Sequence, residues 1–279
     1  MGSQTPSLLV CASPTSRRAA RLSALLLLAY VLSMPVYALL RTVGETALTS
    51  AATWITAGLL FGFALVHSVE TRGFARTVGM LSSAFALAFA AEYLGSKHGL
   101  IFGTYTYTDL LGPKLLSQVP LIIPMAWFMM LYPAWLTAGV LARALGAWTR
   151  LPLAAAAITA WDLSLDPRMV ADGAWIWAES SALHYFGIPL SNFLGWFVTA
   201  SSIYVFWTWL DRTPPPTRVD HAALPVVAYA IVWIGESFAN LLFWEGAGVA
   251  AAVFVAMGAF ATPALLQLRG QPHAVRRAA

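Results

Sequence analysis

The sequence predicts an all-α fold, a polytopic transmembrane helical bundle of about eight helices with kinked or short spans around an intramembrane cavity. Of 279 residues, 59% are hydrophobic and only 10% are charged, whereas soluble domains carry about 25% charged residues. Apolar runs of about twenty residues recur along the chain, and a helix of this length crosses a hydrocarbon core of about 30 Å. We therefore predict a single transmembrane domain over 23–268, between a polar, basic segment 1–22 and a basic tail 269–279. We find no internal repeat.

Eight apolar runs are the expected spans, at 23–40, 50–67, 77–94, 119–141, 151–166, 188–210, 222–243 and 248–266. The first follows Arg17, Arg18 and Arg21, an arrangement that cleaved signal peptides also have. We expect this helix to be retained, because its apolar run is long for a signal peptide and because the charge pattern described next requires it.

The charges between the spans predict the orientation of the bundle. Cytoplasmic loops of membrane proteins hold an excess of Lys and Arg. With the N-terminus in the cytoplasm, the inner segments hold twelve of these residues and the outer segments hold four, which are Arg41, Lys97, Lys114 and Arg168. We therefore expect both termini in the cytoplasm. The acidic residues have the opposite bias, and a site that opens toward the outer half is one explanation.

Two spans are irregular in a way that suggests a cavity. The run 119–141 contains Pro120, Pro124 and Pro133, and a proline inside a helix removes a hydrogen bond and tends to kink it. The run 151–166 would be only about 24 Å long, and Pro167 disfavours helix at Asp166. Short or broken helices at membrane depth are tolerated where they line a cavity.

Several classes of function lack the residues they need. The net charge of +4 comes from basic residues spread between the apolar runs, so we expect no nucleic-acid partner. Cys11 is the single cysteine, which excludes a disulfide framework. The five histidines include no pair three or four residues apart and no Glu-x-x-His sequence of the di-iron type. With no glycine-rich phosphate motif either, we expect no metal and no cofactor.

The strongest candidate for chemistry is Trp161-Asp-Leu-Ser-Leu-Asp-Pro167, where Asp162 and Asp166 are spaced to share one face of a helix. Two carboxyl groups this close in a poorly solvated place favour retention of a proton by one of them, as a general acid requires. The alternative is an acid at a helix end that is paired with Arg168 or held by backbone amides.

A second candidate region lies between the spans 77–94 and 119–141. It contains Glu92 and Asp109 on either side of a Gly-Thr-Tyr-Thr-Tyr-Thr sequence with Tyr105 and Tyr107. Ionisable groups at membrane depth usually face a cavity or a substrate path. The alternative is an ordinary interfacial loop whose tyrosines lie among lipid headgroups.

Two further spans carry buried polar residues. Glu236 lies in an apolar run with Asn240 one turn later, and Asn192 begins the run before it. An acid in such a place is by default functional, although it can instead bond to another helix. We expect these side chains to point into the same cavity.

The motifs also carry a family resemblance. Glu92-Tyr-Leu-Gly, Phe102-Gly-Thr-Tyr-Thr-Tyr-Thr-Asp-Leu-Leu-Gly-Pro113, Pro124-Met-Ala-Trp127 and the block from Trp161 to Trp196 are similar to bacterial and archaeal integral-membrane carotenoid biosynthesis proteins, which include carotenoid 1',2'-hydratases. The resemblance covers 50–266. It implies cofactor-free hydration of the terminal double bond at an acyclic carotenoid end, giving a tertiary alcohol, in a bacterial or archaeal cytoplasmic membrane. The implied substrates are γ-carotene, lycopene-like ends or C50 bacterioruberin precursors, and the other expected partners are membrane lipid and further carotenoid-pathway enzymes.

For that reaction we expect Asp162 and Asp166 to supply the proton, and Glu92 or Asp109 to orient the water and accept its proton. Aromatic faces can stabilise the cation by up to about 2 kcal/mol, and the candidates are Trp127, Trp161, Tyr105 and Tyr107. Glu236 and Asn240 would complete the hydrogen-bond network. A membrane carotenoid cyclase is the alternative enzyme, and a carotenoid or lipid carrier or a proton-coupled transporter is the alternative from another class.

Overall fold

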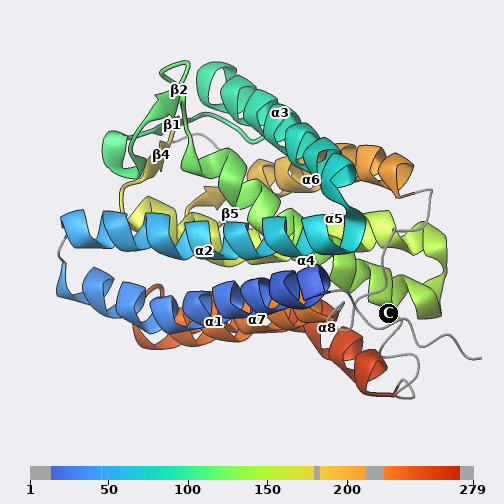
Figure 1. Ribbon diagram of the computed structural model, residues 1–279. Coiled ribbons are helices and arrows are strands. Elements are labelled where there is room, and N and C mark those ends of the chain that lie inside the picture. The colour runs from blue at the N-terminus through green and yellow to red at the C-terminus, as the bar shows by residue number, and fades with distance from the viewer. Residues whose placement is uncertain (1–13, 45, 179–182, 212–222, 271–279) are drawn as a thin grey trace, which may run out of the picture.

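The computed structural model describes residues 14–44, 46–178, 183–211 and 223–270, and over this part of the chain it is a bundle of eight long helices (Figure 1). They are α1 (Pro14–Val43), α2 (Thr46–Arg72), α3 (Phe74–His98), α4 (Ile122–Leu145), α5 (Arg150–Ala171), α6 (Leu190–Leu210), α7 (Leu224–Leu242) and α8 (Ala247–Gly270). The all-α bundle is confirmed, and each expected span corresponds to one of these helices. Residues 1–13, the linker 212–222 and the tail 271–279 lie outside the described residues.

Three short antiparallel ribbons lie in the connections before α4 and α6. Strand β1 (Tyr105–Tyr107) pairs with β4 (Trp175–Trp177), β2 (Lys114–Leu115) with β3 (Val119–Pro120), and β5 (His184–Tyr185) with β6 (Ile188–Pro189). Two single 3₁₀ turns complete the connections, η1 (Asp109–Leu111) and η2 (Ala147–Thr149). The ribbon of β1 and β4 joins the connection after α3 to the connection after α5, and Figure 1 shows it at one end of the bundle.

Helix α4 is the centre of the bundle and packs against α2, α3, α5, α7 and α8. Of its most apolar membrane-length stretch, 78% is buried, against 28% for each of α1, α2 and α3. A helix that is apolar on all sides belongs in an interior, and α4 places Trp127, Phe128, Tyr132 and Trp135 there. The outer helices instead present leucines such as Leu32 on their exposed faces.

Seven of the described helices, all but α5, are long and apolar enough to cross a membrane. Every membrane-length stretch of α5 contains Asp162, Asp166 and an arginine. Asp162, Asp166 and Arg168 are buried, and Arg150 is half-buried. Helix α5 packs against both α4 and α6. The chain is therefore an integral membrane protein whose most polar helix is inside the bundle.

The prolines act differently from the expectation. Val119-Pro120 and Ile188-Pro189 form strands β3 and β6 and are not helical, because a residue before proline disfavours the α conformation. Pro124 lies in the first turn of α4, where its missing N–H costs nothing. The predicted starts of these two helices, at 119 and 188, are therefore wrong: α4 begins at Ile122 and α6 at Leu190.

Helix α5 does not stop at Asp166 but runs through Pro167 to Ala171, and with 22 residues it is about 33 Å long. The prediction of a short span is therefore wrong. A residue 167 with an N–H would donate to the Leu163 carbonyl, and that oxygen instead accepts the Tyr185 hydroxyl at 3.2 Å. The tertiary hydrogen bond supplies the partner that the proline removes.

The order of elements repeats within the chain. The segment α3, β1, β2, β3, α4 is followed by α5, β4, β5, β6, α6, apart from the two 3₁₀ turns. The prediction of no internal repeat is therefore wrong. The repeat is hard to recognise in the sequence because the two segments share the order of their elements but few of their residues. Corresponding pairs, each about 70 residues apart, are Glu92 and Asp162, Gly103 and Gly173, Tyr105 and Trp175, Pro120 and Pro189, and Trp127 and Trp196.

Candidate active site

Glu92 is a buried carboxylate held by three donors. It lies in the last third of α3, and its side chain accepts from the hydroxyls of Tyr105 at 2.5 Å and Tyr107 at 2.7 Å and from Trp127 Nε1 at 2.9 Å. The two tyrosines reach it together because alternate residues of a strand lie on one face. Burial, and next the Glu92 carboxylate, raise the pKa of both phenols well above its usual value. Both hydroxyls therefore stay protonated and donate to Glu92.

Asp162 and Asp166 lie one turn apart on α5 and are both buried, as their spacing predicts. Asn192 joins them: its Nδ2 donates to Asp162 Oδ2 at 2.7 Å and also to Asp166 Oδ2. Trp175 Nε1 donates to the other oxygen of Asp166 at 2.6 Å. The two aspartates thus share one amide donor and form a single hydrogen-bonded unit between α5, α6 and β4.

The two groups of acids face one small cavity of about 30 Å³. Glu92 lines it from α3 and Asp166 from α5. A cavity needs about 10–15 Å³ of this kind of volume, with several polar partners, to hold a water molecule. The cavity is therefore of the size of a water site and has carboxyl groups from both repeats in its wall. Its other lining residues are Phe102, Tyr105, Tyr107, Ile123, Ala126, Trp127, Leu165, Trp175, Trp177, Asn192 and Trp196.

Next to it lies a much larger apolar cavity of about 290 Å³, close to the lower limit of typical ligand pockets. The two cavities share wall residues Ile123, Ala126, Leu165 and Trp175. Helices α1, α2, α4, α5 and α7 all contribute to the large cavity. The predicted intramembrane cavity is therefore present, and these four shared residues form the wall between it and the water-sized cavity.

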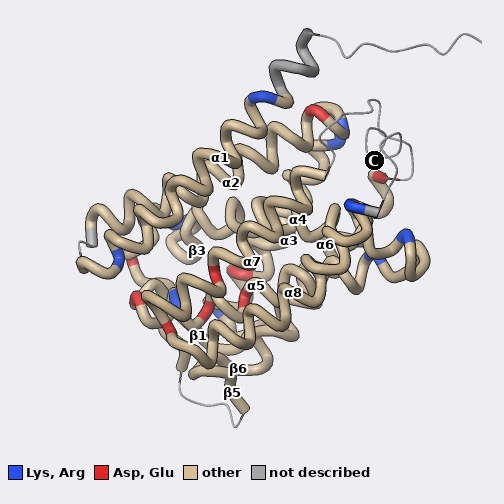
Figure 2. The backbone as a smooth tube through the Cα atoms, turned by 90° about the horizontal axis from the view of Figure 1, so that it is seen from below, with Lys and Arg blue, Asp and Glu red and all other residues tan. Residues whose placement is uncertain are grey.

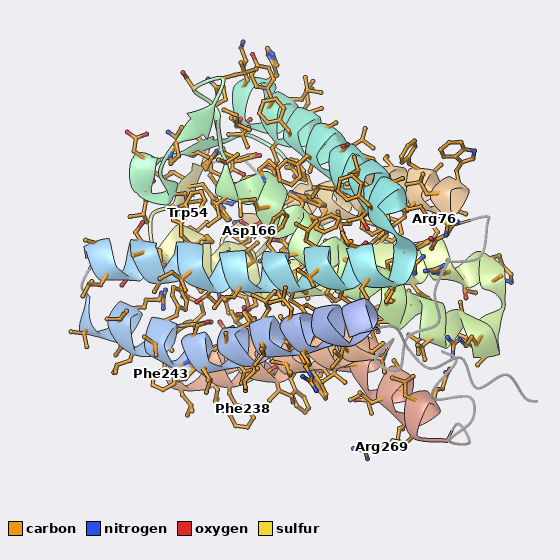
Figure 3. The ribbon with its side chains drawn as sticks, viewed as in Figure 1. Trp54, Arg76, Asp166, Phe238, Phe243 and Arg269 are labelled. Carbon is orange, nitrogen blue, oxygen red and sulfur yellow. The ribbon has the colours of Figure 1, made fainter. Side chains whose placement is uncertain are left out.

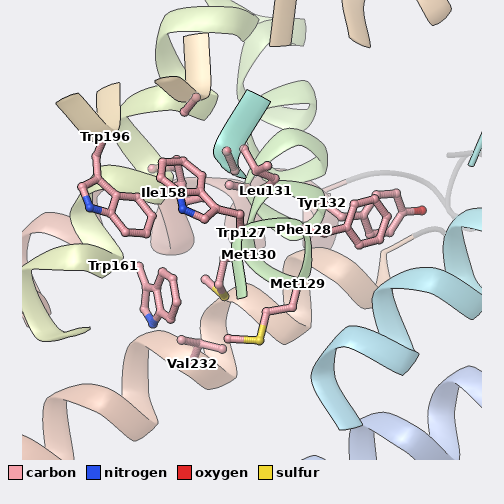
Figure 4. Packing of buried hydrophobic residues seen from close by; sticks show 14 of the residues in the cluster. Trp127, Phe128, Met129, Met130, Leu131, Tyr132, Ile158, Trp161, Trp196 and Val232 are labelled. Carbon is pink, nitrogen blue, oxygen red and sulfur yellow. The ribbon is translucent and has the colours of Figure 1, made fainter. Parts of the chain in front are cut away.

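Three tryptophans in contact with one another line the two cavities, Trp127 and Trp196 the small one and Trp161 the large one. Trp127 and Trp196, from equivalent positions of the two repeats, have ring centroids 3.9 Å apart and planes at 13°. Trp161 meets Trp196 edge to face at 6.0 Å and lines the large cavity. Figure 4 shows these three indoles next to one another, with Met129, Met130 and Val232 beyond Trp161.

Glu236 forms a separate group on the wall of the large cavity. It accepts from Ser164 Oγ at 2.7 Å and from Arg168 Nη1 at 2.8 Å, and Asn240 Nδ2 donates to the same serine oxygen at 2.7 Å. The ion pair with Arg168 is buried on both sides. Arg168 is therefore the partner of Glu236, and the alternative in which it neutralises the two aspartates of α5 is wrong.

Asp109 lies apart from these groups. Its side chain is 98% exposed in η1, where it accepts from Lys114 Nζ at 2.7 Å. The hydrogen bond and the charge of Lys114 lower the pKa of Asp109. The structure therefore brings Glu92, Asp166 and Asn192 to the small cavity, together with Tyr105, Tyr107 and Trp127. Asp162 does not line the cavity but bonds to Asn192, and Asp109 lies on the surface.

Three residues of the site have no candidate role from the sequence alone: Trp175, Trp177 and Trp196. The signal was present, because Trp175-Ile-Trp177 has the same alternation as Tyr105-Thr-Tyr107, and the β1–β4 register places Trp175 opposite Tyr107. Among the described residues, no three His, Cys, Asp or Glu side chains are grouped as a metal site requires.

Comparisons with known proteins identify the family of the chain. The family model described as "Carotenoid biosynthesis protein" matches residues 50–262, which include both repeats and Glu236. The chain is similar to the bisanhydrobacterioruberin hydratase of Haloarcula japonica, with 30% identity over 185 residues that cover 63% of this chain and 61% of the relative. The chain thus matches less than two thirds of that relative's length. No solved structure matches. Because the family model spans most of the chain, the protein belongs to the carotenoid biosynthesis protein family.

Proposed function

We propose that the protein is a carotenoid 1',2'-hydratase, which adds water to the terminal double bond of an acyclic carotenoid end. One observation carries the proposal: buried carboxyl groups from two repeats face a water-sized cavity that borders a larger apolar one. A hydration site for a hydrocarbon needs these two compartments, since water and the alkene must meet while bulk water is kept out. The printed name of the Haloarcula relative, a hydratase, supports the same reaction.

In the proposed reaction the unit of Asp162 and Asp166 supplies the proton. A trisubstituted alkene has no polar group to bind, so it must be protonated by a positioned acid. The π electrons form the new C–H bond at C-2', and the cation is left on the tertiary carbon C-1'. The water oxygen then bonds to C-1', and Glu92 takes the proton that this water loses. Return of that proton to the aspartates restores the site, so the net change is the addition of one water.

Aromatic side chains would stabilise the cation. Trp127, Trp161 and Trp196 line one or both cavities, and the faces of such rings attract a cation by up to about 2 kcal/mol when water is absent. Tyr105 and Tyr107 have a different role from the expected one in this proposal. Their hydroxyls fix the Glu92 carboxylate, so they position the group that accepts the proton.

Glu236 is assigned to the wall of the substrate cavity, and Asn240 to the hydrogen-bond network beside it. Their bonds to Ser164 and Arg168 tie α7 to α5, and Ser164 lies midway in the chain between the two aspartates. With the proposed cytoplasmic termini, all these acids lie in the outer half of their helices. Figure 2 shows the Asp and Glu residues gathered mainly around the end of the bundle that carries β1, with Lys and Arg prominent at the opposite end.

The first experiment is pigment analysis by liquid chromatography and mass spectrometry in a host that makes γ-carotene or lycopene. With the wild-type chain we expect a more polar pigment, heavier by one water. Asp162→Asn together with Asp166→Asn should abolish it, whereas the matched control Asp109→Asn should keep it. Wild-type product from the double variant would overturn the assignment of the acid.

Other outcomes of the pigment analysis would support one of the alternative functions. An isomeric, ringed pigment would make the protein a cyclase, which protonates the same end but excludes water. The internal repeat gives some support to a transporter, because paired repeats are common in that class. Pigment that is bound but chemically unchanged would favour a carrier or a transporter over a hydratase.

A further inference from the structure

The large cavity opens sideways. Among the described residues that line it, the strongly exposed ones are Pro35 of α1, Phe238 of α7 and Phe243 just after α7. Phe238 is 55% exposed and Phe243 50%, and Figure 3 shows both at the edge of the bundle beside α1. The residues lining it from α2, α4 and α5 are buried or half-buried. The opening therefore lies between α1 and α7, on a face that an integral membrane protein turns to lipid.

The opening is a slot with two closed ends. At its inner end the helices approach closely, since a methyl group on Gly235 would lie only 2.0 Å from Met34 Cε. At its outer end Arg41 of α1 binds Glu245 at 3.2 Å, and Tyr37 meets Trp244 edge to face at 5.8 Å. Between Met34 and Arg41, α1 rises by about 10 Å. Along the rest of its length α1 packs mainly on α2.

The outer closure is well anchored. Arg41 also binds Asp172, at 2.7 Å, and lies over the Trp244 ring at 5.5 Å, while Arg168 lies over the same ring at 4.6 Å. The inner closure is a contact between a glycine and the end of a methionine, a flexible side chain that adapts to what it touches. A ligand can therefore widen the slot at Met34 more easily than at Trp244.

We propose that this slot is the path of the substrate: the reacting end lies in the cavity, and the polyene passes out between α1 and α7 into the lipid. The ligand class rests on the proposed function. A cavity of about 290 Å³ encloses an end group but not a whole carotenoid, so the remainder must leave it. The slot is the apolar route, because the outer end is closed by Arg41, Asp172 and Glu245.

The proposal makes Met34, Pro35 and Phe238 specificity-determining residues. Two of them belong to α1, which precedes the family-matched region 50–262. Selectivity for the part of the carotenoid beyond its reacting end would then come from a segment that the family model does not cover.

The test compares long and short ligands. The slot variant is Pro35→Trp with Phe238→Trp. Its matched control, Leu32→Trp with Leu241→Trp, introduces the same two tryptophan side chains at exposed sites of the same helices that do not line the cavity. An interior variant, Leu60→Phe, narrows the cavity from the opposite wall. The first probe is the lycopene that co-purifies from a producing host, and retained lycopene is counted together with its hydrated product. The second is a monoterpene hydrocarbon with the same acyclic end, followed by its shift of the thermal unfolding midpoint.

We expect the slot variant to retain about tenfold less lycopene than the wild type and to keep the full thermal shift with the monoterpene, which also shows that it is folded. The matched control should keep both, and Leu60→Phe should weaken both. The proposal is overturned if the slot variant retains lycopene as the wild type does, if its matched control loses as much, or if the wild type retains none. Retained lycopene without a hydrated product would refute the hydratase and leave the slot standing.

Discussion

At the scale of single residues, Glu92 is defined by its donors. Three aromatic side chains donate to its two oxygens, from a strand and from the central helix. Hydrogen bonds to a charged group are about twice as strong as neutral ones. A carboxylate held this way cannot turn away from the cavity, so its position relative to Asp166 is fixed before any ligand arrives.

The same contacts make the fold sensitive to alkali. The raised pKa values of Tyr105 and Tyr107 mean that the native phenols keep their protons at a pH where unfolded tyrosines, with a pKa of about 10, have lost theirs. The native state then binds more protons, so the free energy of unfolding is unaffected below about pH 10 and falls as the pH rises further. Thermal unfolding between pH 8 and pH 11 should show this fall. For Tyr107→Phe the free energy of unfolding should fall less steeply with pH than for the wild type, by up to about 1.4 kcal/mol per pH unit. Parallel curves for the two proteins would contradict the assignment.

At the scale of elements, α5 shows how a helix is kept intact through a proline. The Leu163 carbonyl, which Pro167 cannot satisfy, accepts the hydroxyl of Tyr185 from β5. The ribbon between α5 and α6 therefore stabilises the helix at the turn that carries both aspartates.

A double-mutant cycle measures this support. Tyr185→Phe should lower the free energy of unfolding by about 1 kcal/mol in the wild type. In a Pro167→Ala background the new backbone N–H bonds to Leu163, so the same change should cost clearly less. Equal costs in both backgrounds, from chemical unfolding in detergent, would show that the hydroxyl does not replace the missing amide.

At the scale of the whole molecule, the orientation that the charges predict can be tested at two exposed sites. Asp109 is at the end that carries the ribbons and Trp148, 81% exposed, follows α4 at the other end. With Cys11 replaced by Ser, a membrane-impermeant maleimide should label Asp109→Cys in intact cells, and Trp148→Cys only after the cells are permeabilised. The reverse pattern would place the termini outside.

The features that could be predicted from the sequence are those that depend on residues close together in the chain. The eight helices and the pairing of Asp162 with Asp166 follow from composition and from spacing within one helix, which are local. Glu92 stood out because an acid in an apolar run is costly. The partners were harder: Asp109 resembled Glu92 in the sequence but binds a neighbouring lysine, and Trp175 was indistinguishable from the many tryptophans of a membrane belt. The pairing of β1 with β4 brings Trp175 opposite Tyr107, and because it joins distant segments no local pattern in the sequence predicts it.

The ribbon of β1 and β4 also has a consequence for the order of assembly. Glu92 is made early in synthesis, but its cavity is closed by Trp175 and Trp196, which belong to the second repeat. Contacts between segments so far apart in the chain form late, since a long loop must first be closed. The cavity that Glu92 and Asp166 line is therefore closed only after α6 has been synthesised, and a nascent chain that ends at α4 carries only one of its two carboxyl groups.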